Sequence, residues 1–254
     1  MPTIVLAIDA YSQLEQLLPA ALLLASGQNA LLLGVFAQDS RLLQGAALPC
    51  TQEIGANSAA CFPLTAETME NRVRRIAEDM RRRLAMAAER RKLPWEFQLC
   101  YGSISQITTE TTADAVLPGW SGHLWISGSH PGPPTRSSAA RAAIAVVDDG
   151  SLSAAQAVEA ARRLTAAAGL PELVILEMDS VPVPGLTGSA RSSVGRPPEV
   201  RIRVDSPDQL MRHLRVLCPT LMLLGRDQPL ASDSRLRKEL FLLKCPLALL
   251  SATW

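Results

Sequence analysis

The stretch "AAIAVVDDGSLSAAQAVEAARRL", residues 142–164, lies in the middle of the 254-residue chain but has the pattern of a protein's beginning. Six apolar residues are followed by Asp148, Asp149 and Gly150, and then by an alanine-rich segment with helical character. A continuous apolar run that ends in acid and glycine is typical of a buried parallel strand leading into a helix. The pattern therefore predicts that an α/β unit begins here.

The first residues of the chain have the same order of features. The apolar run Thr3–Ile8 ends at Asp9, and Ser12 and Glu15 have the spacing of a capping box at the start of a helix. Gly27 is predicted to end that helix. The later copy repeats the capping spacing and the closing glycine with Ser153, Gln156 and Gly169.

The remaining predicted elements follow the same order in each copy. In the first copy, a long loop at 39–64 precedes a helix that opens at Thr65, and the other elements are strands 31–36, 95–101 and 123–127 and a short helix 105–115. In the second copy, a long loop at 180–198 takes the place of the long helix, and the other elements are strands 173–178, 200–204, 221–224 and 246–250, a helix capped by Ser206 and a helix at 236–243.

An internal repeat of strands that alternate with helices predicts an α/β fold with parallel sheets and right-handed crossovers. We expect two tandem, doubly wound, Rossmann-like domains that form a pseudo-dimer within one chain. The predicted domains are residues 1–135 and a shortened copy at 140–254, with a hinge near 131–141.

Composition excludes several classes of protein. Hydrophobic residues make up 48% of the chain and charged residues 19%, which is typical of a globular protein. The net charge of +1 gives no global field for nucleic acid or a membrane surface. The five cysteines form no CxxC pair, and no secretory signal is visible, so we expect a cytoplasmic protein.

One stretch of basic residues suggests either of two roles. The predicted helix after Thr65 carries nine Arg and Lys residues between Arg72 and Lys92. We interpret them as a solvated face with ion pairs along the helix. A docking surface for an acidic partner or nucleic acid is the alternative.

Several stretches together resemble the universal stress protein family in its tandem form. They are "IVLAID" and "IAVVDDGS" for the first strand, "CYGSISQITTETTADA" for the third strand and its helix, "LWISGSH" and "LMLLGRD" for the fourth strand, and "LRKELFLLKCPLALL" for the last helix and strand. The resemblance implies two universal-stress-protein-like domains.

Nucleotide-binding members of this family carry a Gly-x2-Gly-x9-Gly-Ser/Thr signature after the fourth strand, where glycines let the backbone approach phosphates. This chain departs from it, because Gly128 is followed by Gly132 and Gly225 has no second glycine three residues later. Asp9 and either Asp148 or Asp149 remain at strand ends, where they could touch a ribose or adenine edge or simply form turns. The resemblance thus implies a degenerate site made of five residues, namely Asp9, Gly128, Gly132, Asp149 and Gly225.

The function that follows is a non-enzymatic regulatory protein that binds an adenine nucleotide, ATP or AMP, weakly. No catalytic serine motif and no histidine spacing typical of a metal site is present. The alternative is a protein-interaction module with a decayed nucleotide site, working with an unidentified protein partner or as a homodimer. A nucleotide hydrolase ranks last because no phosphate loop or base is identifiable.

Overall fold

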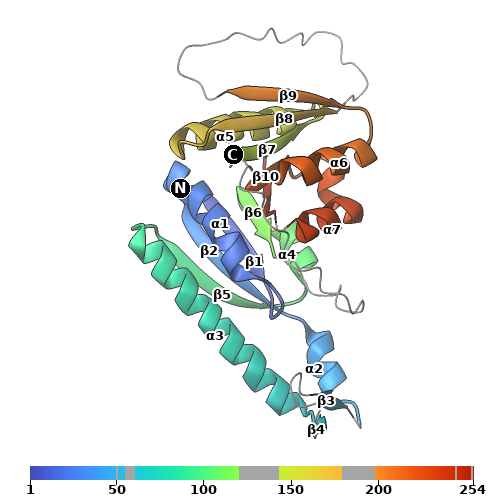
Figure 1. The fold of residues 1–254 in the computed structure, drawn as a ribbon. Helices are drawn as coiled ribbons and strands as arrows, with labels where there is room; N and C mark the ends of the chain where they lie inside the picture. Colours follow the sequence, from blue (N-terminus) through green and yellow to red (C-terminus); the bar gives the residue numbers. More distant parts are fainter. Residues whose placement is uncertain (50, 55–60, 120–142, 179–197, 244, 253) are drawn as a thin grey trace.

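The computed structural model describes residues 1–49, 51–54, 61–119, 143–178, 198–243, 245–252 and 254. Nine strands form one sheet in the order β5-β2-β1-β6-β11-β10-β7-β8-β9. In Figure 1, β9 lies at one end of this sheet, at the top, and β5 lies at the other end. The strands are β1 (Thr3–Ile8), β2 (Leu31–Gln38), β5 (Trp95–Tyr101), β6 (Ala115–Pro118), β7 (Ala143–Asp148), β8 (Glu172–Met178), β9 (Glu199–Val204), β10 (Leu221–Gly225) and β11 (Leu247–Leu250).

Helices cover both faces of the sheet. The helices are α1 (Leu14–Gln28), α2 (Ser40–Ala46), α3 (Ala66–Arg90), α4 (Ile104–Glu110), α5 (Leu152–Ala167), α6 (Pro207–Leu217), a short 3-10 turn η1 (Pro229–Ser232) and α7 (Ser234–Leu242). Side chains of α1, α3 and α5 share one core on one face. On the other face, α4 packs on the first half of the sheet, and α6 and α7 pack on the second half. None of the helices in the described part of the chain is long and apolar enough to cross a membrane.

The two halves of the sheet repeat the same strand order and register. In the first half, Ile4 of β1 lies opposite Leu32 of β2 and Ala115 of β6. The corresponding residues of the second half are Ile144, Leu173 and Leu221. Each half therefore has the spatial order third, second, first, fourth strand, and the predicted equivalence of the two strand beginnings is confirmed.

The halves meet edge to edge through β6 and β11, which pair antiparallel, with Val116 opposite Leu249. They therefore form one sheet rather than two, and the other strand pairs in this sheet are parallel. Arg226 strengthens this junction, because its guanidinium donates to the carbonyl oxygens of Thr111 (2.7 Å) and Ala113 (2.8 Å) in the first half. The predicted hinge at 131–141 lies outside the described residues, so the domain division stays a prediction.

Gly27 does not end α1 as predicted. The helix continues to Gln28 and ends at Asn29 in the left-handed conformation, with φ of 50°. A Cβ atom on Gly27 would lie 3.0 Å from Cδ2 of Leu164 in α5. The glycine therefore allows α1 of the first half to approach α5 of the second half, which continues the shared core across both halves.

The helix caps are shifted as well. Ser153 does not cap α5, because Ser151 accepts the hydrogen bond from Ala154 N instead. Gly169 follows that helix with φ of 60°, as predicted for a closing glycine. Ser206 caps α6 with Pro207 in its first turn, also as predicted.

Two other sequence predictions are corrected. The region 39–64 is not a long loop, because its described part contains α2 and the antiparallel hairpin β3 (Gln52–Ile54) and β4 (Cys61–Pro63). The short helix predicted to reach Ala115 ends at Glu110, and Ala115–Pro118 is the strand that pairs with β1. The predicted strand 123–127 and loop 180–198 fall wholly or almost wholly outside the described residues.

The basic helix α3 begins as predicted, with the side chain of Thr65 accepting from Thr68 N. Val73, Met80 and Leu84 are buried on one face. Exposed side chains of this helix form ion pairs three or four residues apart, as predicted, between Arg74 and Glu70, Arg81 and Glu78, Arg82 and Asp79, and Arg83 and Asp79.

Candidate functional site

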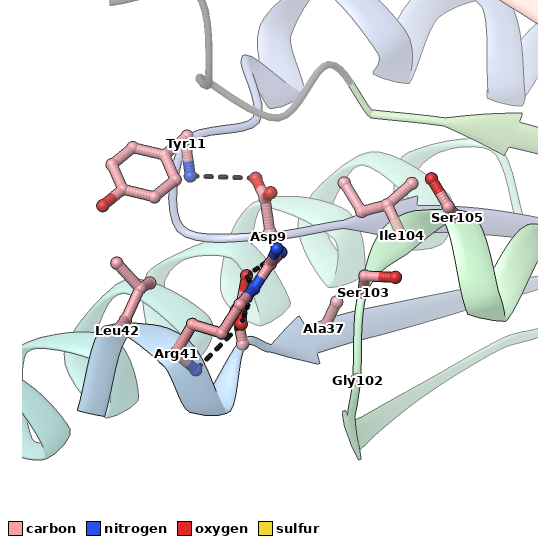
Figure 2. Close-up of a pocket in the computed structure, with 10 residues that line it drawn as sticks. Asp9, Tyr11, Ala37, Arg41, Leu42, Gly102, Ser103, Ile104 and Ser105 are labelled. Atoms are coloured by element: carbon pink, nitrogen blue, oxygen red, sulfur yellow. Dashed lines mark hydrogen bonds and ion pairs between the residues drawn. The ribbon is translucent and has the colours of Figure 1, made fainter. Parts of the chain in front are cut away.

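A pocket of about 350 Å³ lies at the carboxyl ends of β1, β2 and β5. This is the edge at which open α/β sheets bind ligands. Polar and charged groups of the lining come from Asp9, Tyr11, Asp39, Arg41, Ser103 and Ser105, and the rest comes from Ala37, Leu42, Gly102 and Ile104. Figure 2 shows Asp9 near the centre of this group, with Tyr11 and Leu42 on one side of it and Ile104 on the other.

Asp9 is held in place by its own turn. Its Oδ1 accepts hydrogen bonds from the backbone N of Tyr11 (3.0 Å) and from Oγ of Ser12 (2.8 Å). Oγ of Ser12 in turn accepts from the backbone N of Asp9 (2.9 Å). Ser12 therefore fixes the carboxylate and does not cap α1, which begins at Leu14 without a side-chain cap. The predicted capping box is wrong for this reason.

Asp39 and Arg41 form a second charged group at the pocket. Asp39 caps α2 by accepting from the backbone N of Arg41 (2.9 Å). The guanidinium of Arg41 also holds both carboxylate oxygens, with Nε to Oδ1 at 2.9 Å and Nη2 to Oδ2 at 2.6 Å. Hydrogen bonding to Asp39 raises the pKa of Arg41. The two opposite charges thus neutralise each other, and Figure 2 shows Arg41 with its dashed contacts at the edge of the pocket.

Tyr11 reports a negative potential in the pocket. Its side chain is about half exposed, at 48%. Burial raises the pKa of its phenol, and the carboxylates of Asp9 and Asp39 raise it further. The phenol therefore stays protonated near neutral pH and can donate a hydrogen bond, while its ring offers a flat apolar surface.

The third wall of the pocket is the turn from β5 into α4. Gly102 has a φ of 133°, a conformation that favours glycine. Ser103 then caps α4 in a capping box with Gln106, whose Oε1 accepts from the backbone N of Ser103 (3.1 Å). These contacts fix the pocket wall by local backbone geometry.

Gly119 influences the pocket indirectly, through Ser12. It directly follows β6, and its backbone N donates to the carbonyl of Ala7 (2.6 Å). A Cβ atom there would lie 2.3 Å from Oγ of Ser12 and 2.9 Å from the backbone oxygen of Ala7. Only a glycine therefore allows Ser12 to sit where it positions Asp9.

In the second half, the residues equivalent to Asp9 and Gly119 are Asp149 and Gly225, and they make different hydrogen bonds. The backbone N of Gly225 donates to Oε1 of Gln228 (2.8 Å), and Nε2 of Gln228 donates to the carbonyl of Val147 (3.2 Å). Gln228 is buried, with 2% of its surface exposed. Burial acts to raise the pKa of Asp149, but hydrogen bonds with Ser151 and Gln228 outweigh it and lower that pKa. Asp149 is thus engaged by its own half.

The structure separates the residues that the sequence grouped as one kind of site. Asp9 lines the pocket, whereas Asp149 and Gly225 gather around Gln228 in the other half. Gly128 and Gly132 lie outside the described residues. Sequence reasoning missed Tyr11, Asp39, Arg41, Ser103, Gly119 and Gln228. Within the described ranges, no group of three or more His, Cys, Asp and Glu side chains is arranged to hold a metal ion.

The comparisons with known proteins find similarity in structure but none in sequence. The sequence matches no family model and no curated protein. Among solved structures, the chain is similar to a universal stress protein from Archaeoglobus fulgidus DSM 4304, with a TM-score of 0.46 and 11% sequence identity. The similarity covers 98% of this chain and 96% of that chain.

Proposed function

We propose that this chain is a non-enzymatic regulatory protein of the universal stress type, and that the pocket of its first half binds an adenine nucleotide weakly through the adenosine moiety. The observation that carries the proposal is the position of Asp9. Its fixed carboxylate lines a pocket at the carboxyl edge of a mostly parallel sheet. The pocket volume of about 350 Å³ is within the range of small-ligand sites.

The lining suits an adenosine. A carboxylate accepts hydrogen bonds from ribose hydroxyls, which is the role that acidic residues at strand ends have in dinucleotide-binding folds. The ring of Tyr11 and the side chains of Leu42 and Ile104 offer apolar surface for a base. We assign the ribose to Asp9 and the base to the apolar group.

We expect the phosphates of a bound nucleotide to contribute little to its affinity. Counted from Gly119, which directly follows the fourth strand β6, Gly119, Gly122 and Gly132 have the Gly-x2-Gly-x9-Gly spacing of the family signature. Pro133 stands where the signature has Ser or Thr, and proline offers neither a hydroxyl nor a backbone N–H. The backbone N of Gly119 is already bonded to Ala7. We therefore expect a Kd for ATP above about 100 μM, or about −5.5 kcal/mol.

A binding role fits this lining better than catalysis. Nucleophilic catalysis by a serine needs an adjacent base. Ser103 uses its hydroxyl to cap α4, and the described lining of the pocket contains no histidine. Asp9 has its carboxylate engaged by Ser12 and by backbone, which suits a fixed acceptor better than a proton carrier.

A thermal-shift experiment with AMP and ATP tests the proposal. A ligand at about 100 times its Kd stabilises the folded protein by about 2.7 kcal/mol, so the midpoint rises measurably. Asp9→Asn is expected to abolish the rise, and the matched Asp149→Asn, at the equivalent position of the second half, is expected to keep it. Equal loss in both variants, or no rise in the wild type, would contradict the proposal.

A second candidate function is protein interaction along the edge strand β5. Leu99 is 54% exposed and Tyr101 is 82% exposed on this strand. An edge strand with exposed apolar side chains is a surface on which a second strand can pair. Sedimentation of the wild type and of Leu99→Ser/Tyr101→Ser tests this: a wild-type dimer that the double variant dissolves supports it, and two monomeric proteins argue against a homodimer.

A further inference from the structure

The charges of the pocket decide which adenine compound it favours. Among the described residues that line it, the charged ones are Asp9, Asp39 and Arg41. Two carboxylates and one guanidinium give this lining a net charge of minus one. The raised pKa of Tyr11, to which both carboxylates contribute, agrees with a negative potential there.

Arg41, the one cation among the described lining residues, already forms an ion pair. Arg41 contacts both carboxylate oxygens of Asp39, at 2.9 Å and 2.6 Å. A phosphate that recruited this guanidinium would have to displace Asp39, whose carboxylate would then face the phosphate without a counter-charge. The pair is bidentate but 66% of the Arg41 side chain is exposed, so the carboxylate neutralises the cation without locking it in place.

Hydrogen-bond donors, by contrast, find acceptors in this pocket. Asp9 brings a carboxylate to it, and a carboxylate can accept about four hydrogen bonds, whereas the oxygens of Asp39 are held by Arg41. A nucleoside brings ribose hydroxyls and an exocyclic amino group, which are donors, and it brings no negative charge. We propose that the pocket selects uncharged adenosine over AMP and ATP.

This inference rests on the proposed function, because it names the preferred ligand of the same site. A protein with this selectivity responds to the nucleoside itself rather than to the phosphorylation state of the nucleotide pool. The charged pair Asp39–Arg41 is then the specificity-determining element, and Asp9 is the anchor.

Calorimetry with adenosine, AMP and ATP tests the selectivity, with a chelator present so that magnesium does not neutralise the phosphates. At low ionic strength we expect ATP to bind about tenfold more weakly than adenosine, with AMP in between. The difference in affinity between adenosine and ATP should narrow at about 0.15 M salt, where charges are screened beyond about 8 Å.

Asp39→Asn assigns the effect to the charged pair. Asparagine also caps helices well, so α2 keeps its cap while one negative charge is lost and Arg41 is released. We expect this variant to bind ATP at least as well as adenosine. Asp208→Asn, on the exposed first turn of α6 in the other half, changes the net charge by the same amount and should leave the gap unchanged.

The possible results distinguish a failure of the proposed adenosine selectivity from a failure of the proposed adenine site. Wild-type protein that binds ATP as tightly as adenosine, or more tightly, overturns the inference and leaves the adenine site standing. A gap that persists in Asp39→Asn overturns the role of the Asp39–Arg41 pair. If none of the three compounds binds, the proposed function itself fails, and the inference fails with it.

Discussion

The two halves of this sheet end their first and fourth strands in different ways. In the first half, the backbone N of Gly119 bonds directly to the carbonyl of Ala7. In the second half, the amide of Gln228 stands between the equivalent groups, accepting from Gly225 N and donating to Val147 O. The β7–β10 ladder accordingly has three register pairs, whereas the β1–β6 ladder has four. The two halves thus share one strand register but differ where these strands end.

That difference underlies our proposal that the first half, and not the second, holds a ligand through its aspartate. Asp9 turns its carboxylate to the pocket, where Ser12 and Tyr11 N fix it. The carboxylate of Asp149 accepts hydrogen bonds from Ser151 and Gln228 within its own half. A buried glutamine thus contacts the aspartate in the second half, whereas the aspartate of the first half lines a pocket.

The largest effect is expected from Gln228→Ala. Removing the amide leaves Gly225 N and Val147 O buried without their partner, and each such group costs about 1–3 kcal/mol. We expect a loss of about 3 kcal/mol in the free energy of unfolding, measured by urea denaturation. Gln106→Ala, which removes an exposed glutamine from a capping box, should lose less than about 1 kcal/mol. Similar losses in both variants would show that Gln228 does not join the strands.

Alanine at either of the equivalent glycines Gly119 and Gly225 should lower the free energy of unfolding somewhat less than Gln228→Ala does. At Gly225 the new Cβ would lie 2.7 Å from Cβ of Ser153, and at Gly119 it would lie 2.3 Å from Oγ of Ser12. Overpacking of this kind costs about 1–3 kcal/mol, and we expect about 2 kcal/mol for each variant. Gly119→Ala should also weaken adenosine binding, because Ser12 positions Asp9, whereas Gly225→Ala should leave binding unchanged.

Gly45→Ala is the control for the glycine variants. Nothing lies within 4 Å of the Cβ position at this helical glycine. Alanine should therefore stabilise the protein by about 0.4–1 kcal/mol through helix propensity and a restricted unfolded chain. If Gly45→Ala destabilises the protein, steric contact does not explain why alanine is costly at Gly119 and Gly225.

The two edge strands should differ in how much one side chain contributes to stability, and the variant on β9 should have the smallest effect of all. Phe97 of β5 and Arg201 of β9 hold equivalent register positions, opposite Gly34 and Ile175. Phe97 packs beneath α3, so Phe97→Ala should cost about 2 kcal/mol, less than a fully buried aromatic. Arg201 makes exposed ion pairs, so Arg201→Ala should cost at most about 0.5 kcal/mol. Equal losses in urea denaturation would show that the two edges are covered alike.

Much of the fold could be predicted from the sequence, because buried parallel strands are continuous apolar runs. The sequence predicts β1 and β5 with their exact bounds, and β2 and β7 to within two residues. β6 was missed because it has only four residues and ends in Pro118, which reads as a break rather than a strand. That error displaced the glycine count, so Gly128 was taken for the glycine that follows the fourth strand, a place that Gly119 holds.

The candidate site was predictable only in part. Asp9 was found because it follows an apolar run, and the same signal existed for Asp39 and Gly102, which follow β2 and β5. The region after β2 was interpreted as loop, which hid Asp39 as a helix cap. Gln228 could not be found, because a polar side chain that bridges two strands is set by their spacing and leaves no periodic signal.

The central claim is that the ligand site lies at the strand ends of the first half, and amide chemical shifts test it most directly. Titrating ¹⁵N-labelled protein with adenosine should shift the amides of Asp9, Ala37, Gly102 and Ser103, which line the pocket. The amides of Asp149 and Gly225 in the second half should stay unchanged. Shifts centred on Asp149 and Gly225, or no shifts at millimolar adenosine, would contradict the account.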